Sequence, residues 1–74
     1  MTMTDRIKLL DVVALMEDLP EQGLLHGQVG TVVEELAPHV FEVEFCDDEG
    51  RTYAMLEARA EQLLALRFHP GMEA

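Results

Sequence analysis

Apolar and polar residues alternate along the middle of the chain, and this alternation predicts β-strands. In Val40–Cys46 the sequence VFEVEFC places apolar side chains at every second position, with Glu42 and Glu44 between them. Successive side chains of a strand point to opposite faces, so this segment presents one apolar and one acidic face. Further runs predict four more strands, at Leu9–Met16, Gln28–Leu36, Arg51–Leu56 and Leu64–Phe68. The first of these is mostly apolar and could be a strand or a helical turn, but its length and its pair of β-branched residues favour a strand.

Turn-forming residues separate these runs. Glu17–His26 reads as a long loop, because Pro20 holds the residue before it extended and Gly23 permits a tight turn. Asp47–Gly50 reads as a hairpin turn. Glu57–Leu64 has helical composition but is too short for more than one stable turn. This order predicts an all-β fold, a small five-stranded Src-homology-3-like barrel with a long loop after the first strand and a short helical turn before the last.

The length of the chain limits what it can bury. We expect 74 residues to form a single domain, ordered over about residues 7–68 and frayed at both termini. Apolar burial contributes on the order of 110 kcal/mol, and ordering the chain costs about the same. A partner or a second copy would therefore add stability that the isolated chain lacks.

Charge narrows the range of partners. The chain has 15 acidic and 5 basic residues, for a formal net charge of −10. Such a surface repels nucleic-acid phosphates and anionic membranes, whereas a basic protein complements it. The single cysteine, Cys46, allows no internal disulfide, and the sequence has neither a signal peptide nor an apolar run of about 20 residues. These features predict a cytoplasmic protein.

The predicted hairpin also suggests an interaction surface. Pairing Cys46 with Arg51 would set Val43 opposite Ala54, Phe41 opposite Leu56, and Glu44 opposite Tyr53. The outward face would then combine tyrosine and methionine with a polar surround, which is typical of protein interfaces. Leu24 and Leu25 in the long loop either cover an edge of the core or contact a partner. The candidate interface comprises Glu42, Glu44, Arg51, Tyr53, Met55, Leu24 and Leu25.

Other residue groups suggest chemistry, but simpler explanations fit each of them better. Carboxylates at 47–49 could hold a hard cation, although aspartate also suits a hairpin tip. His26, His39 and His69 could bind zinc with Cys46, yet they lack the usual ligand spacing. No motif supports a role for Cys46 as a nucleophile, or for Glu42 and Glu44 as an acid–base pair. We therefore predict no catalytic residues, no bound metal and no cofactor.

Three phrases resemble the bacterial domain of unknown function 4926 family. They are DVVALMEDLPEQGLLHGQVGTVVE, FEVEFCDDEGRTYAML and RAEQLLAL, which together span about Asp11–Leu66. The most specific parts are DVVAL, the GQVGTVVE run and VEFCDDEGRTYA. The resemblance implies a small Src-homology-3-like barrel and supplies no catalytic residues.

These observations favour a non-enzymatic, acidic protein-interaction module. Such a module could be the accessory or neutralising, antitoxin-like partner of a basic protein, and its carboxylates could imitate nucleic-acid phosphates. One alternative is a self-associating structural protein that pairs through its outer sheet face or an open edge. Another is a small-ligand or metal-binding domain that uses the acidic hairpin.

Overall fold

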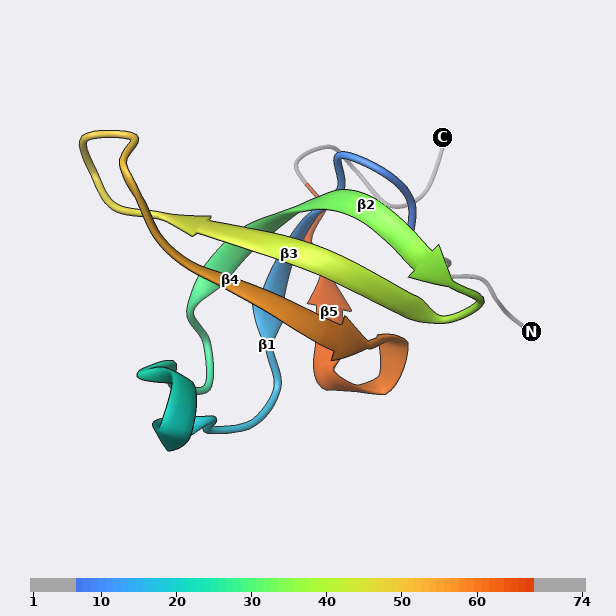
Figure 1. Ribbon diagram of the computed structural model, residues 1–74, viewed down its shortest axis with the longest axis horizontal. Coiled ribbons are helices and arrows are strands. Elements are labelled where there is room, and N and C mark those ends of the chain that lie inside the picture. Colours follow the sequence, from blue (N-terminus) through green and yellow to red (C-terminus); the bar gives the residue numbers. More distant parts are fainter. Residues whose placement is uncertain (1–6, 68–74) are drawn as a thin grey trace, which may run out of the picture.

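A computed structural model describes residues 7–67, which form five strands and two short 3-10 turns (Figure 1). In chain order they are β1 (Val12–Leu15), η1 (Pro20–Gln22), β2 (Val29–Ala37), β3 (Val40–Cys46), β4 (Thr52–Arg59), η2 (Ala60–Gln62) and β5 (Leu63–Ala65). The predicted all-β fold is confirmed. The predicted frayed termini and the end of the closing strand at Phe68 lie outside the described residues.

The five strands form one antiparallel sheet in the order β4-β3-β2-β1-β5. The sheet bends strongly, so that β3 and β4 cross in front of β1 and β5 in Figure 1. The outermost strands, β4 and β5, do not pair with each other over residues 7–67. The sheet is therefore open, and the predicted closed barrel is not confirmed. No helix within these residues is long and apolar enough to cross a membrane.

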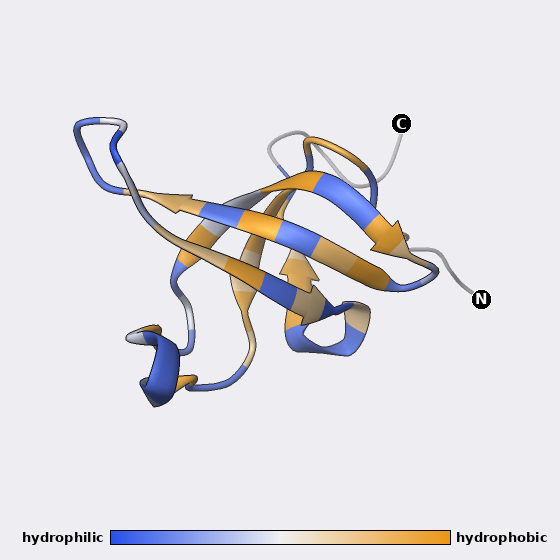
Figure 2. Cartoon of the chain, viewed as in Figure 1, coloured by the Kyte–Doolittle hydropathy of each residue, from blue (hydrophilic) through white to orange (hydrophobic). Residues whose placement is uncertain are grey.

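The core fills the space between the two halves of the bent sheet. Every strand contributes inward side chains, and the alternation of apolar and polar residues is visible along β3 and β4 in Figure 2. The buried hydrophobic residues are Val13, Leu15, Leu24, Val32, Phe41, Val43, Phe45, Ala58 and Leu63. Since this core is small, the charged and polar side chains of the described residues all remain at least partly exposed.

β2 is the strand on which the sheet bends. Its pairing with β3 is irregular between Val32 and Glu34 and again between Glu35 and Ala37, and such bulges increase local twist. Gly30 lies at the other end of β2, where an added Cβ would come within 2.7 Å of Val43 Cγ1. A residue without a side chain is needed here because β3 packs directly over it.

The predicted register of the β3–β4 hairpin is wrong. Cys46 pairs with Thr52, not with Arg51, and Val43 pairs with Leu56, not with Ala54. Likewise Phe41 lies opposite Ala58, not Leu56, and Glu44 lies opposite Met55, not Tyr53. Along most of the hairpin the strands are thus shifted by two residues.

The hairpin turn explains this shift. The Asp47 amide donates a hydrogen bond to the Arg51 carbonyl at 2.8 Å, so Arg51 belongs to the turn. A register shift follows between Phe45 and Cys46, where Tyr53 is the extra residue of β4. Because a shift of two residues preserves the face of each side chain, Ala54 and Leu56 still face the core as predicted.

The segment predicted as a helical turn divides among three elements, and its last two residues begin β5. Residues 57–59 extend β4 and bring Ala58 into the core, whereas the helical part is only the three residues of η2. The Gln62 side chain accepts a hydrogen bond from the Arg59 amide at 2.8 Å, which holds this turn. Apolar residues at alternate positions therefore outweigh helical composition between 56 and 59.

Candidate functional site

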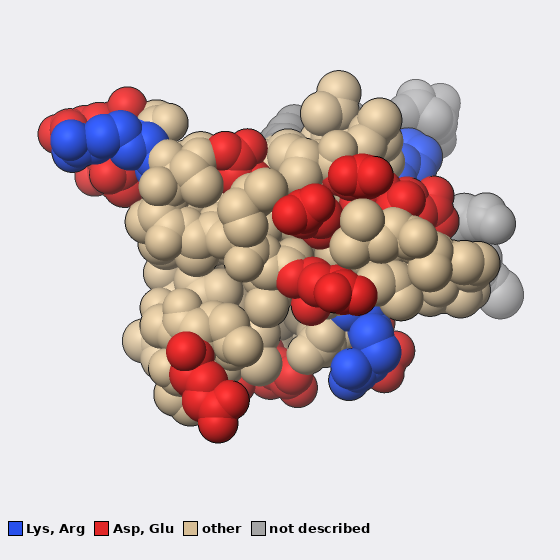
Figure 3. Space-filling view, viewed as in Figure 1, with Lys and Arg blue, Asp and Glu red and all other residues tan. Residues whose placement is uncertain are grey.

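Three glutamates line up across three adjacent strands on the outer face of the sheet. Glu34 of β2 lies directly opposite Glu42 of β3, and Glu42 lies directly opposite Glu57 of β4. Figure 3 shows acidic side chains gathered over the middle of these strands, whereas basic side chains lie at the hairpin tip, beyond the end of β4 and at the upper right of the view. We call Glu34, Glu42 and Glu57 the glutamate row.

No ion pair from residues 7–67 reaches the glutamate row. Arg51 pairs with the carboxylates of its own hairpin tip, and Arg59 pairs with Glu61 at 2.9 Å. The hydrogen bond from Arg59, together with its positive charge, lowers the pKa of Glu61. Like charges directly opposite each other on a sheet are generally destabilising, and no ion pair between described residues offsets them in the row.

Glu44 and Met55 extend this outer face beside the row. They lie directly opposite each other on β3 and β4, and Thr31 of β2 is the other neighbour of Glu44. The Thr52 hydroxyl donates a hydrogen bond to the Glu44 carboxylate. Met55 is half-exposed and presents an apolar surface next to the carboxylates. The outer face of β3 and β4 therefore brings Glu42, Glu44 and Met55 together.

Arg51 and Tyr53 lie elsewhere than predicted. Arg51 points to Asp47 and Glu49 at the hairpin tip and does not approach Glu44 diagonally across the strands. The Tyr53 ring lies 6.4 Å from the ring of the buried Phe45, and its hydroxyl accepts a hydrogen bond from Gln28 at 2.9 Å. These contacts direct Tyr53 toward the core edge, because the bulge removes it from the regular alternation.

The two leucines of the long loop have different environments. Leu24 is completely buried, because the loop folds back through paired backbone hydrogen bonds between Leu19 and Leu24. It covers the core edge and is not available to a partner. Leu25 is 57% exposed and stays on the surface of the loop.

The residues considered for metal binding do not come together. Among residues 7–67, no group of three or more histidine, cysteine, aspartate or glutamate side chains is arranged to hold a metal ion. The Asp47 carboxylate accepts hydrogen bonds from the amides of Glu49 and Arg51, at 2.9 and 3.0 Å, which is turn chemistry. Exposed Cys46 contacts the Thr52 hydroxyl through sulfur at 3.7 Å. His69 lies outside the described residues.

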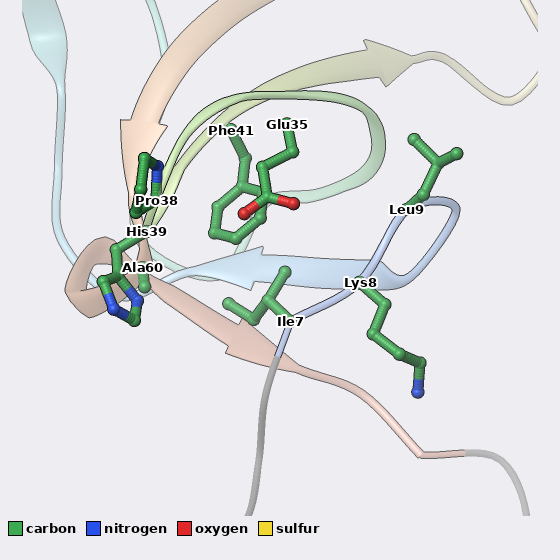
Figure 4. A pocket seen from close by; sticks show the side chains of 8 residues that line it. All are labelled: Ile7, Lys8, Leu9, Glu35, Pro38, His39, Phe41 and Ala60. Carbon is green, nitrogen blue, oxygen red and sulfur yellow. The ribbon is translucent and has the colours of Figure 1, made fainter.

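A groove of about 700 Å³ opens between the N-terminal segment, the β2–β3 turn and η2. Its lining residues are Ile7, Lys8, Leu9, Glu35, Pro38, His39, Phe41 and Ala60. Figure 4 shows Phe41, Ile7 and Glu35 turned toward the same space, whereas the Lys8 amine points away from it. The groove thus combines apolar side chains with the Glu35 carboxylate and the His39 imidazole.

Sequence reasoning missed two members of the glutamate row. Glu57 was assigned to the helical turn, and the two-residue register error hid its position opposite Glu42. The signal was present in the sequence, because the alternation of β4 continues through Leu56 and Ala58 on the inward side. Glu34 depends on the bulge after Val32, for which the sequence has no marker.

Comparison with known proteins is consistent with the sequence resemblance. No curated protein and no solved structure matches the chain. A family model described as a domain of unknown function (DUF4926) matches residues 9–65, which include all five strands. The chain therefore belongs to the DUF4926 family.

Proposed function

We propose that this protein is a non-enzymatic interaction module that binds a basic protein through the outer face of β2, β3 and β4. The observation that carries the proposal is the glutamate row, three carboxylates in direct cross-strand register without a compensating ion pair from residues 7–67. Bound lysine or arginine side chains would replace repulsion by attraction, so binding relieves an unfavourable feature of the free protein.

The surroundings of the row support a protein as the partner. Met55 supplies an apolar contact beside the carboxylates, and Glu44 extends the acidic surface along β3. A patch with an apolar anchor and charged neighbours suits a folded partner that brings both a basic and an apolar surface. More specifically, we propose that the chain binds a basic protein in the cytoplasm and acts as its accessory or neutralising, antitoxin-like partner.

The strand order supports a finer proposal about the fold. The meander β2-β3-β4, with β1 between β2 and β5 and a 3-10 turn before the last strand, is the arrangement we associate with a Src-homology-3-like barrel. Modules of this size commonly use their sheet faces and loops for binding while the core serves only stability. The glutamate row occupies such a face.

A crosslinking pull-down that compares the native chain with variants tests the proposed function. The full chain is used as bait in native cells with crosslinking, beside a triple variant Glu34→Gln, Glu42→Gln, Glu57→Gln. We expect the native bait to capture a basic protein in stoichiometric amount and the triple variant to lose it. Purified components should show binding that weakens as salt rises, because exposed charge pairs are screened.

The control bait is Glu21→Gln, which removes one exposed carboxylate from η1, away from the row. It should capture the same protein as the native chain. The proposal would be contradicted if the triple variant still captured the basic protein. It would also be contradicted if Glu21→Gln lost the protein to the same extent as the triple variant. Binding that persists unchanged in about 1 M salt, where the screening length is only about 3 Å, would contradict it as well.

A further inference from the structure

One edge of β4 pairs with no other strand among residues 7–67. The strand lies at the end of the order β4-β3-β2-β1-β5 and pairs with β3 alone. The other outermost strand, β5, has only three residues, whereas β4 has eight. An unpaired edge presents backbone N–H and C=O groups that can pair with another chain. The edge of β4 is therefore the longer of the two that a binding partner could use.

The alternation of the ladder identifies the backbone groups that face this edge. The Ala60 amide donates a hydrogen bond to the His39 carbonyl at 2.9 Å, and the register stays regular from there up to the bulge. Because only alternate pairs of an antiparallel ladder exchange hydrogen bonds, Met55 and Glu57 turn their N–H and C=O groups away from β3. The Glu57 side chain lies on the outer face and forms no ion pair with residues 7–67. The edge thus combines available backbone groups with an uncompensated carboxylate.

The inward side chains at this edge are incompletely covered. On β3, Val43 and Phe45 are completely buried. Their partners on β4, Leu56 and Ala54, pack against the core yet stay partly exposed. A strand added beside β4 would place every second side chain on this inward side, next to Leu56. Its other side chains would lie on the outer face, one of them directly opposite Glu57.

We infer that an extended segment of the basic partner adds to β4 as an antiparallel strand, with lysine or arginine on the outer face and apolar side chains inward. The inference rests on the proposed function, because it specifies how the basic partner of the glutamate row is bound. In β-strand addition, backbone hydrogen bonds supply affinity and alternate side chains supply specificity. A basic residue opposite Glu57 would extend the row by one strand with the opposite charge. A second copy of the chain suits this edge less well, since both copies carry a charge of −10.

Titration of the full chain with a synthetic peptide tests this inference. The probe is a peptide as long as β4 in which lysine alternates with valine, and calorimetry in about 0.1 M salt measures its Kd. In an antiparallel pair the lysines opposite Met55 and Glu57 bond to β4, so N-methylation of the lysine amides should raise the Kd at least about 10-fold. N-methylation of the valine amides is the matched control. It should leave the Kd unchanged, because those amides point away from β4.

Two single variants of the chain test whether the peptide lies beside β4. Glu57→Gln removes the carboxylate opposite the added strand and should raise the Kd of the unmodified peptide about 3- to 5-fold. Glu34→Gln removes the same charge from β2, which lies three strand spacings, or about 14 Å, from the added strand. Since this exceeds the screening length of about 10 Å, Glu34→Gln should change the Kd less than about 2-fold.

The strand addition is overturned if the native chain does not bind the unmodified peptide. It is also overturned if the two N-methylated peptides bind equally, or if the two single variants weaken binding equally. The proposed function stands in each of these cases as long as the triple glutamine variant loses the captured basic protein. Retention of that protein by the triple variant would instead contradict the proposed function, and the peptide results would not alter that.

Discussion

Gly30 shows how a single residue sets the spacing between β2 and β3. A methyl group at this position would lie 2.7 Å from Val43 Cγ1 and 2.9 Å from the Glu44 carbonyl oxygen. The second atom is backbone, so this contact cannot be relieved without shifting β3. We therefore expect Gly30→Ala to lower the free energy of unfolding by about 1–3 kcal/mol, as overpacking does, measured by urea denaturation.

Two further variants separate steric crowding at Gly30 from a general effect of substitution. Thr31→Ala changes the next residue on the outward side and should alter stability by no more than about 0.5 kcal/mol. Val43→Ala removes the methyl group closest to the added Cβ. In the double variant it should therefore offset part of the stability lost by Gly30→Ala, so the two changes in the free energy of unfolding should not add. A Gly30→Ala chain as stable as the native one would show that β3 does not press on β2.

Among the strands, β3 is the one on which acidic charge accumulates. Glu42 has a glutamate directly opposite on each side, whereas Glu44 lies between Thr31 and Met55 and accepts a hydrogen bond from Thr52. We expect Glu42→Gln to raise the free energy of unfolding by about 0.5–1 kcal/mol at low salt, since it removes two like-charge contacts. Denaturant titration at about 0.01 M and 1 M salt should show the gain shrinking as charges are screened.

Glu44→Gln is the matched control on the same strand and face. It changes the formal charge by the same amount but relieves no directly opposed carboxylate and weakens the hydrogen bond from Thr52. Its stability should be unchanged or slightly lower. If both variants stabilise the protein equally, the effect comes from net charge alone and the cross-strand register of Glu42 contributes nothing.

The same two strands show what the sequence could predict and where it could not. The alternation in Val40–Cys46 placed β3 and its two faces correctly, because burial of every second side chain is a local pattern. Pairing depends on the turn, and the sequence has no marker for a turn that includes Arg51 or for the extra residue at Tyr53. The core residues of β3 were therefore predictable, whereas the glutamate row, which depends on pairing across three strands, was not.

Across the whole molecule, the outer face of the bent sheet divides near the middle of β2 into an acidic half and an apolar half. Val29, at one end of the strand, lies directly opposite Ala14 of β1, and Glu34, five residues later, belongs to the glutamate row. One strand thus contributes both apolar and acidic side chains to the outer face.

The net charge of the molecule also predicts how salt affects stability. With a net charge of −10, self-repulsion opposes the compact state, and salt should raise the melting temperature by screening it. The triple variant Glu34→Gln, Glu42→Gln, Glu57→Gln has a formal charge of −7 and should lose much of this salt dependence. Glu21→Gln has a charge of −9 and should retain nearly all of it. Thermal melts of all three chains at one fixed protein concentration measure the effect, because any association would make the melting temperature depend on concentration. An equal salt slope in all three chains would mean that repulsion is spread over the surface, and the glutamate row would then lose its special role.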